Sequence, residues 1–169
     1  YVLKKTGAGS VIHVKSGATL TLTDSKPRAV HKFTVEENGL WVLNEDNGTK
    51  RAHGGVLTGG CSNYGGGVYV EGGGTFTMES GIIAGCAATS DGGGVYVSKD
   101  STMTMNGSAS ISGCTADSAD SAGIYLAGTL TPNGGTVQNT IMVETRGKIA
   151  ARSNGSTTGT IFTNAVLNY

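Results

Sequence analysis

The chain has 169 residues, enough for one domain with a sizeable core, and 29 of them are glycine while only 2 are proline. Its formal net charge is zero, but residues 54–135 carry one lysine against six carboxylates, a local charge of −5, which disfavours nucleic acid or anionic lipid as a partner. No apolar run is long enough to cross a membrane, and without a signal peptide or initiator methionine the chain is expected to be an excised or mature segment.

The apolar runs between the glycines follow one another as a repeated unit. They are rich in valine, isoleucine, leucine, tyrosine and threonine and lack helical periodicity, so the chain is predicted to be all-β. Residues 10–24 (SVIHVKSGATLTLTD) match the first half of a unit, and residues 54–61 (GGVLTGGC) match its last part. Whole units follow at 65–91 and 92–120, each opening with GGGVYV, and a degenerate unit begins at Ser121.

This repetition predicts a parallel β-helix. A period of about 27 residues is typical of a solenoid, in which each unit buries its apolar face only against its neighbours. Three short alternating runs in each unit predict three strands per coil, with glycines at the corners. We therefore expect a single domain over residues 1–169 with about five coils. Repeat coils occupy 10–24 and 54–140, and 141–169 supplies a last coil and closing segment with a polar loop at 152–160.

Residues 25–53 interrupt the repeat. The run KFTVEENGLWVLNE alternates on both sides of Asn38-Gly39, which predicts a β-hairpin leaving the first coil after Asp24 and returning at Gly54. One interpretation is a binding arm that presents the sole tryptophan, Trp41. The interpretation we favour is a flap whose Trp41, Phe33 or Leu43 packs on the side of the helix or covers its open end.

Stacked coils turn aligned positions into columns of side chains that share one core. The first strand is predicted to bury Ile12, Val68, Val95 and Ile124, together with Val14, Val70, Val97 and Leu126. The second strand buries Leu20, Phe76, Met103 and Leu130, and the third buries Leu57, Ile83, Ile111 and Val137.

The three cysteines follow the same period. Cys61, Cys86 and Cys114 are 25 and 28 residues apart, which is neither a metal-ligand spacing nor a dense disulfide framework. We predict a structural stack of reduced, buried thiols just past the third strand. Their parallel side-chain directions disfavour a disulfide.

The pattern GGGVYV…GTFTM…SGIIAGCAA resembles the right-handed parallel β-helix repeats of large surface proteins and adhesins of gut bacteria, which are distantly similar to pectate-lyase-like helices. The resemblance covers about residues 10–24 and 54–140. It implies a right-handed parallel β-helix and an extracellular or cell-surface location. Those repeats often carry asparagine where this chain has cysteine, and either residue suits the same internal position.

Three tyrosines are predicted to face outward in the first strand. Tyr69, Tyr96 and Tyr125 align in successive coils, with His13 before them and Met142 after them. Such a stripe can bind sugar rings, and Trp41 is a further candidate for ligand binding. The alternative is an aromatic ladder that stiffens the solenoid by offset stacking, worth about 0.5–1.5 kcal/mol per pair.

Two ranks of threonine are predicted on the outer face of the second strand. They consist of Thr19, Thr75, Thr102 and Thr129, and of Thr21, Thr77, Thr104 and Thr131. The T-x-T pattern resembles the surface of β-solenoid ice-binding proteins, which makes ice binding a minor alternative. Threonine is also an ordinary exposed β-former.

The search for catalytic chemistry finds one weak candidate. Asp91 and Asp117 are placed where adjacent coils can bring them together as a carboxylate pair or cation site, although a solvated turn explains them as well. No dinucleotide or phosphate loop and no nucleophile elbow is present in the sequence. We therefore expect no enzyme activity, no cofactor and no metal.

The sequence favours a non-enzymatic structural or adhesive segment of a longer bacterial repeat protein. Its partners are expected to be glycans or a host-surface protein, with no nucleic acid and no membrane insertion. The alternative is a fragment of a carbohydrate-active enzyme, a polysaccharide lyase or hydrolase.

Overall fold

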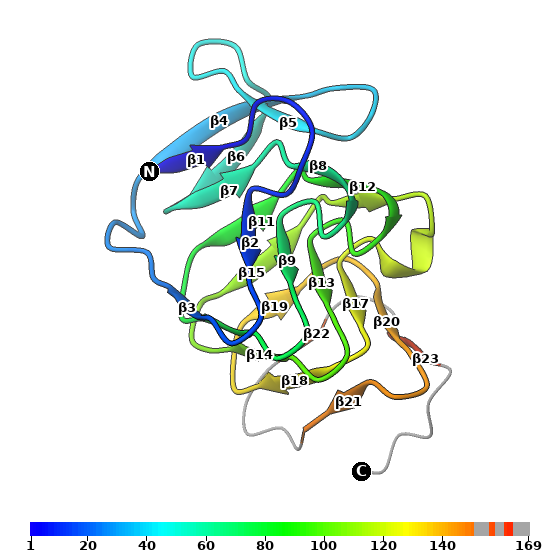
Figure 1. The fold of residues 1–169 in the computed structure, drawn as a ribbon. Helices are drawn as coiled ribbons and strands as arrows, with labels where there is room; N and C mark the ends of the chain where they lie inside the picture. Colours follow the sequence, from blue (N-terminus) through cyan, green and yellow to red (C-terminus); the bar gives the residue numbers. More distant parts are fainter. Residues whose placement is uncertain (151–155, 158–160, 164–169) are drawn as a thin grey trace.

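The structure is a parallel β-helix with an antiparallel arm on its side (Figure 1). It is a computed structural model that describes residues 1–150, 156–157 and 161–163, so most of the polar loop predicted at 152–160 lies outside the described residues. No helix in the described part of the chain has the length and apolar character of a membrane span. The predicted all-β class and three strands per coil are confirmed.

Three parallel sheets form the walls of the helix. The first-strand sheet has six strands: β2 (Ile12–Val14), β9 (Val68–Val70), β13 (Val95–Val97), β17 (Ile124–Leu126), β20 (Ile141–Val143) and β23 (Ile161–Thr163). The second-strand sheet has five: β3 (Thr19–Leu22), β10 (Thr75–Met78), β14 (Thr102–Met105), β18 (Thr129–Pro132) and β21 (Lys148–Ile149). The third-strand sheet has six: β1 (Val2–Lys4), β7 (Val56–Thr58), β11 (Ile82–Ala84), β15 (Ser110–Ser112), β19 (Thr136–Val137) and β22 (Ser156–Thr157).

Two features of the coils were absent from the sequence prediction. Strand β1 adds a rung before the first recognised repeat, in register with β7. A short fourth sheet, the corner sheet, follows the third strand and contains β8 (Cys61–Tyr64), β12 (Ala87–Asp91) and β16 (Thr115–Ala116). A single 3-10 turn, η1 (Ala119–Ser121), follows β16. The corner strands lack the apolar alternation of the wall strands, so their pairing is imposed by the coils on either side of them.

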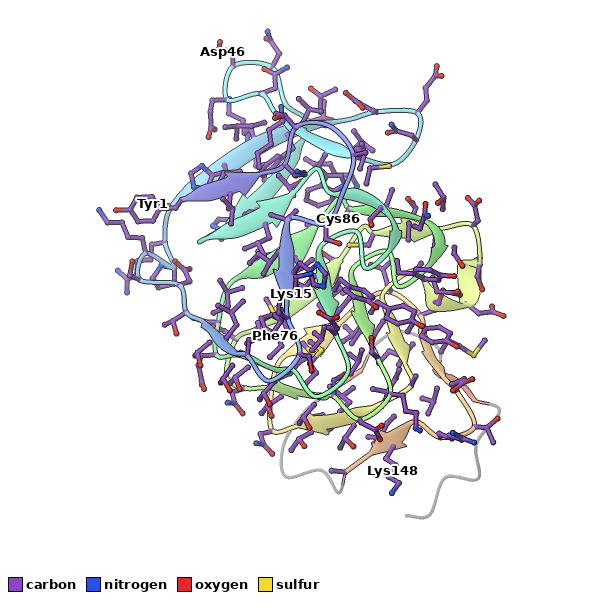
Figure 2. The ribbon with its side chains drawn as sticks, in the orientation of Figure 1. Tyr1, Lys15, Asp46, Phe76, Cys86 and Lys148 are labelled. Carbon is purple, nitrogen blue, oxygen red and sulfur yellow. The ribbon has the colours of Figure 1, made fainter. Side chains whose placement is uncertain are left out.

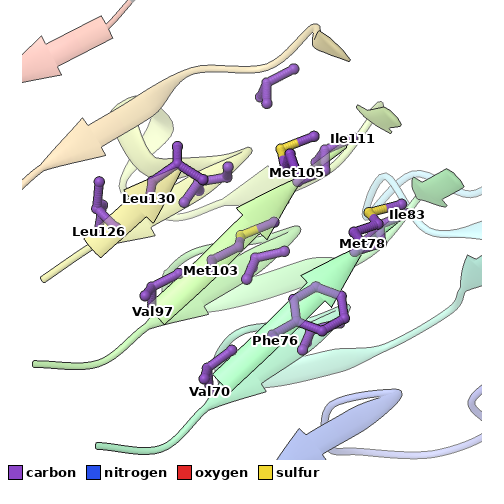
Figure 3. Close-up of a cluster of buried hydrophobic side chains, with 14 of the residues drawn as sticks. Val70, Phe76, Met78, Ile83, Val97, Met103, Met105, Ile111, Leu126 and Leu130 are labelled. Carbon is purple, nitrogen blue, oxygen red and sulfur yellow. The ribbon is translucent and has the colours of Figure 1, made fainter. Parts of the chain in front are cut away.

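The core follows the predicted columns, except that Ile12 and Leu20 in the first coil are only partly buried. Val68 pairs with Val95, Phe76 with Met103, and Ile83 with Ile111. All of these side chains are fully buried, and Met78 and Met105 extend the second-strand column (Figure 3). At the N-terminal end the columns are less covered, and Leu3 is 51% exposed. Each layer therefore depends on the next for its burial.

The repeated glycine triplets have two different physical roles. The first glycine of each triplet takes a left-handed backbone conformation, with φ of 62° at Gly65 and 69° at Gly92. The third is required for close approach: a Cβ on Gly94 would lie 2.6 Å from the Gly123 carbonyl oxygen and 2.7 Å from Ile111 Cγ2. The triplet thus combines a turn with tight stacking of neighbouring coils.

The interruption forms an arm (residues 25–53) built on three antiparallel strands. Strand β4 (Val30–Val35) pairs with β5 (Trp41–Leu43) as predicted, and also with β6 (Lys50–His53), which was not predicted. Gly39 has a φ of 84° in the connecting turn. Figure 1 shows the arm beside β1 and β7, and Figure 2 places its residue Asp46 and Lys148 of the last described coil at opposite ends of the molecule.

The arm packs on the outer face of the third-strand sheet. Phe33 is fully buried and Trp41 is 9% exposed, in a cluster with Val56 and Ala84. The backbone N–H of Trp41 donates to the Gly85 carbonyl at 3.1 Å, and the buried Thr58 hydroxyl donates to the Trp41 carbonyl at 2.9 Å. The flap interpretation is confirmed for the side of the helix.

Of the alternatives that the flap prediction named, Phe33 and Trp41 are the residues that pack, and the side of the helix is where they do so. Leu43 is 38% exposed and stays outside the cluster. The first strands of the three walls, β1, β2 and β3, each pair only with a strand of the following coil, so no strand of the arm extends these sheets.

The shared core generates a stability prediction. Phe76→Ala should lower the free energy of unfolding by about 3–5 kcal/mol, because it removes a fully buried ring between two coils. Thr77→Ala, on the same strand but facing outward, should cost at most about 1 kcal/mol. Chemical denaturation followed by circular dichroism measures both, and equal losses would contradict the layered core.

The arm generates a second prediction. A Cβ on Gly85 would collide with the Trp41 ring, so Gly85→Ala should displace the arm and shift Trp41 fluorescence to the red while the β-sheet circular dichroism is retained. Gly17→Ala is the control, because Gly17 also has a positive φ of 72° but nothing within 4 Å of a new Cβ. An unchanged Trp41 emission in Gly85→Ala would contradict the packing described here.

Candidate binding surface

The tyrosine ladder (Tyr69, Tyr96 and Tyr125) lies on the outer face of the first-strand sheet. The three residues are register partners at the centres of β9, β13 and β17, as predicted. Ring centroids are 5.4 Å apart between Tyr69 and Tyr96, and 4.8 Å apart between Tyr96 and Tyr125, with interplanar angles of 27° and 7°. His13 meets the Tyr69 ring edge to face at 4.8 Å.

This stacking limits what the ladder offers to a ligand. Tyr96 has Tyr69 and Tyr125 stacked on either side, and Tyr64 tilted against it at 5.0 Å. Its ring faces therefore turn toward other aromatic rings, and the half-buried ladder stiffens the sheet by offset stacking. Sugar binding by the ladder itself stays a prediction. Tyr64, at the margin of the ladder, is 44% exposed and more open to solvent than the three ladder rings.

Ionisation of the central tyrosine is suppressed by its surroundings. Burial, together with the neighbouring phenols of Tyr125 and Tyr69 and the carboxylate of Asp91, raises the pKa of Tyr96 to about 12. Burial also raises the pKa of Tyr125, with a contribution from Glu144. The ladder therefore remains uncharged at neutral pH.

A groove of about 660 Å³ opens at the margin of the ladder. It is lined by Ala8, Gly9, Ser10, His13, Cys61, Ser62, Asn63, Tyr64, Tyr69 and Thr89. One wall is the loop 8–10, which Gly9 joins to Cys61 by an antiparallel bridge, and another is β8. The lining thus combines aromatic rings with hydroxyl and amide groups.

Two polar networks hold the sides of the groove. The Thr89 hydroxyl donates to Asn63 Oδ1 at 2.9 Å. The second network is centred on Glu71: His13 Nε2 lies 3.5 Å from Glu71 Oε2, and Lys15 Nζ lies 3.9 Å from the same oxygen. The Ser16 N–H also donates to Glu71 at 3.3 Å. Glu71 is therefore occupied by local contacts.

Sequence reasoning missed Tyr64, Asn63 and the loop 8–10. Tyr64 is aligned with Asp91 in the next coil, so the repeat supplies no tyrosine column that would have drawn attention to it. The usable signal was its position directly before the first glycine triplet, where a coil corner turns a side chain toward the ladder.

Trp41 is buried, as the favoured flap interpretation predicts, so its candidacy as a ligand-binding residue gains no support. Its side chain is 9% exposed and packs between the arm and the corner glycines Gly85 and Gly113. A ring buried in this way holds the arm to the helix and is closed to a ligand.

The predicted cysteine stack is correct for two of its three members. Cys86 and Cys114 are free, buried thiols in successive coils, and contact with Cys114 together with burial raises the pKa of Cys86. Cys61, in contrast, pairs with Ala87 rather than with Cys86, so it is offset by one residue. Because side chains alternate along a strand, this offset turns Cys61 into the groove, where it is partly exposed.

The threonine ranks have the predicted register. Thr75 pairs with Thr19 and Thr102, and Thr102 with Thr129, while the second rank follows the same pairing through Thr21, Thr77, Thr104 and Thr131. The first rank ends where Thr129 pairs with Lys148. Ice binding by this face stays a prediction.

The Asp91 and Asp117 pair gains no support as a cation site. The Asp91 carboxylate accepts hydrogen bonds from the hydroxyls of Ser90 at 2.7 Å and Ser121 at 3.1 Å. For Asp117, the backbone N–H donates to the Ala88 carbonyl in the pairing of successive coils. Within the described residues, no group of three histidine, cysteine, aspartate or glutamate side chains is arranged to hold a metal ion.

No protein-family model matches the chain, and the comparisons with curated proteins and with solved structures found no match.

The ladder generates a pH prediction. Because the pKa of Tyr96 is raised in the folded state to about 12, its contribution to stability is complete below the ordinary value of 10 and is lost as pH rises toward 12. Tyr96→Phe should remove the highest-pH step of the tyrosinate absorbance titration and reduce the loss of stability in this window. Tyr1→Phe, at a tyrosine that is 71% exposed, is the control and should change neither.

Proposed function

We propose that this chain is a rigid, non-catalytic β-helix segment of a longer bacterial surface protein, and that it binds glycans. Three parallel sheets with a shared core make a stiff scaffold, on which binding residues keep fixed positions. The resemblance of GGGVYV…GTFTM…SGIIAGCAA to adhesin-type repeats supports an extracellular setting. A host-surface protein is the second kind of partner that this setting suits.

The observation that carries the proposal is the groove beside the tyrosine ladder. Aromatic rings surrounded by hydroxyl and amide groups are the chemistry that recognises sugars, whose rings have both an apolar face and hydroxyl edges. The nearby carboxylates argue against a hydrolase or lyase site. Glu71 is engaged by His13 and Lys15, and Asp91 by serine hydroxyls.

A glycan array tests the proposal. The purified chain should bind one or more glycans, and Tyr96→Ala should weaken the signal because Tyr96 supports both Tyr64 and Tyr69. Thr77→Ala, on the second-strand sheet, is the matched control and should bind as the unmodified chain does. Absence of binding to every glycan would contradict glycan recognition, and the release of shortened products from a bound glycan would contradict the non-catalytic assignment.

A further inference from the structure

We propose that the groove binds an uncharged sugar unit, with Tyr64 as the ring on which the sugar stacks. This inference rests on the proposed glycan-binding function and specifies its site and its ligand class. It also places recognition beside the tyrosine ladder rather than along it.

Tyr64 is the aromatic ring best placed to act as a platform. It is 44% exposed, whereas the ladder tyrosines are each more buried. Its ring is inclined at 59° to Tyr96 with centroids 5.0 Å apart, so one part is held against the ladder while the rest stays open to solvent. A platform oriented in this way loses little conformational freedom when a ligand binds.

The groove is also preorganised by backbone pairing on two sides. Strand β8 pairs with β12 through Cys61↔Ala87 and Ser62↔Ala88, and Gly9 bridges Cys61 from the N-terminal loop. The hydrogen bond from Thr89 to Asn63 Oδ1 orients the amide so that its Nδ2 group can donate to a sugar hydroxyl.

The charges around the groove favour a neutral sugar. Its lining contains no aspartate, glutamate, lysine or arginine, and its histidine, His13, lies against Glu71. Lys5 lies near Gly9 but is not part of the lining, and it borders a separate pocket that also contains Ala8 and Cys61. An acidic sugar is best held by an arginine fork, which the lining lacks, and it would meet Glu71 and Asp91 nearby.

Cys61 supplies a reporter inside the groove. Its thiol is free and partly exposed, whereas Cys86 and Cys114 are buried. Iodoacetamide should therefore alkylate Cys61 in the folded protein and leave the other two thiols as internal references. A ligand that fills the groove should slow this reaction, and a ligand bound elsewhere should not.

The experiment combines calorimetry with this protection assay. The probes are cellohexaose, mannohexaose, hexa-N-acetylchitohexaose and any neutral glycan bound on the array, with hexagalacturonate as the acidic counterpart. One or more neutral probes should bind and slow Cys61 alkylation. Tyr64→Ala should weaken that binding about tenfold or more, and Tyr64→Phe, which keeps the ring, should retain it. Tyr1→Ala, an exposed tyrosine outside the groove, should change affinity less than about twofold.

Several results would overturn the inference while leaving glycan binding in place. These are unchanged affinity in Tyr64→Ala, unchanged Cys61 alkylation in the presence of a bound chain, or tighter binding of hexagalacturonate than of every neutral probe. The inference also fails if every array glycan that binds is acidic. A chain that binds no glycan at all would instead refute the proposed function itself. Unchanged circular dichroism of Tyr64→Ala, expected for an exposed side chain, separates loss of binding from loss of fold.

Discussion

Backbone hydrogen bonds between successive coils, in register along three parallel sheets, are the constraint on which the rest of this structure depends. They hold equivalent residues of neighbouring coils directly above one another, as in the pairs Phe76↔Met103 and Val95↔Ile124. Because each coil has no core of its own, burial and pairing are acquired together as coils stack. The same register aligns Tyr96 with Tyr69 and Tyr125, so the aromatic ladder follows directly from the backbone pairing.

Exact repetition produces flat, uniform faces, and the distinctive surfaces of this protein arise where repetition fails. The loop 8–10 bridges Cys61 in antiparallel fashion instead of forming a parallel corner strand, and Tyr64 stands where the next coil has Asp91. Together they make a groove at one edge of an otherwise regular face. The Cys61 thiol reaches that groove through a shift of one residue in the column. The regular coils thus form the rigid support, and the groove that we propose as the recognition surface lies at the irregular first coil.

The arm illustrates how an insertion can be joined to such a scaffold. Gly85 and Gly113 have no side chains at the corners of two successive coils, and the Trp41 ring occupies the space where their Cβ atoms would lie. The backbone N–H of Trp41 donates to the Gly85 carbonyl, and the Thr58 hydroxyl donates to the Trp41 carbonyl. These two hydrogen bonds satisfy buried polar groups where the arm meets the helix. The arm therefore buries the outward residues Val56 and Ala84, which would otherwise expose an apolar patch on the third-strand sheet.

The sequence by itself determined the solenoid, its core columns, the tyrosine and threonine ranks and the hairpin around Asn38-Gly39. Each of these follows from local alternation or from aligning one repeat on the next, and in a β-helix sequence alignment and spatial register are the same relation. The tertiary structure alone decided that β1 adds a rung, that the corner strands pair, that Trp41 and Phe33 rather than Leu43 pack on the helix, and that Cys61 and Tyr64 meet in a groove. The corner strands lack the apolar alternation of the wall strands, and the arm and groove contacts involve residues that occur once or depart from the repeat, so neither alternation nor periodicity revealed them.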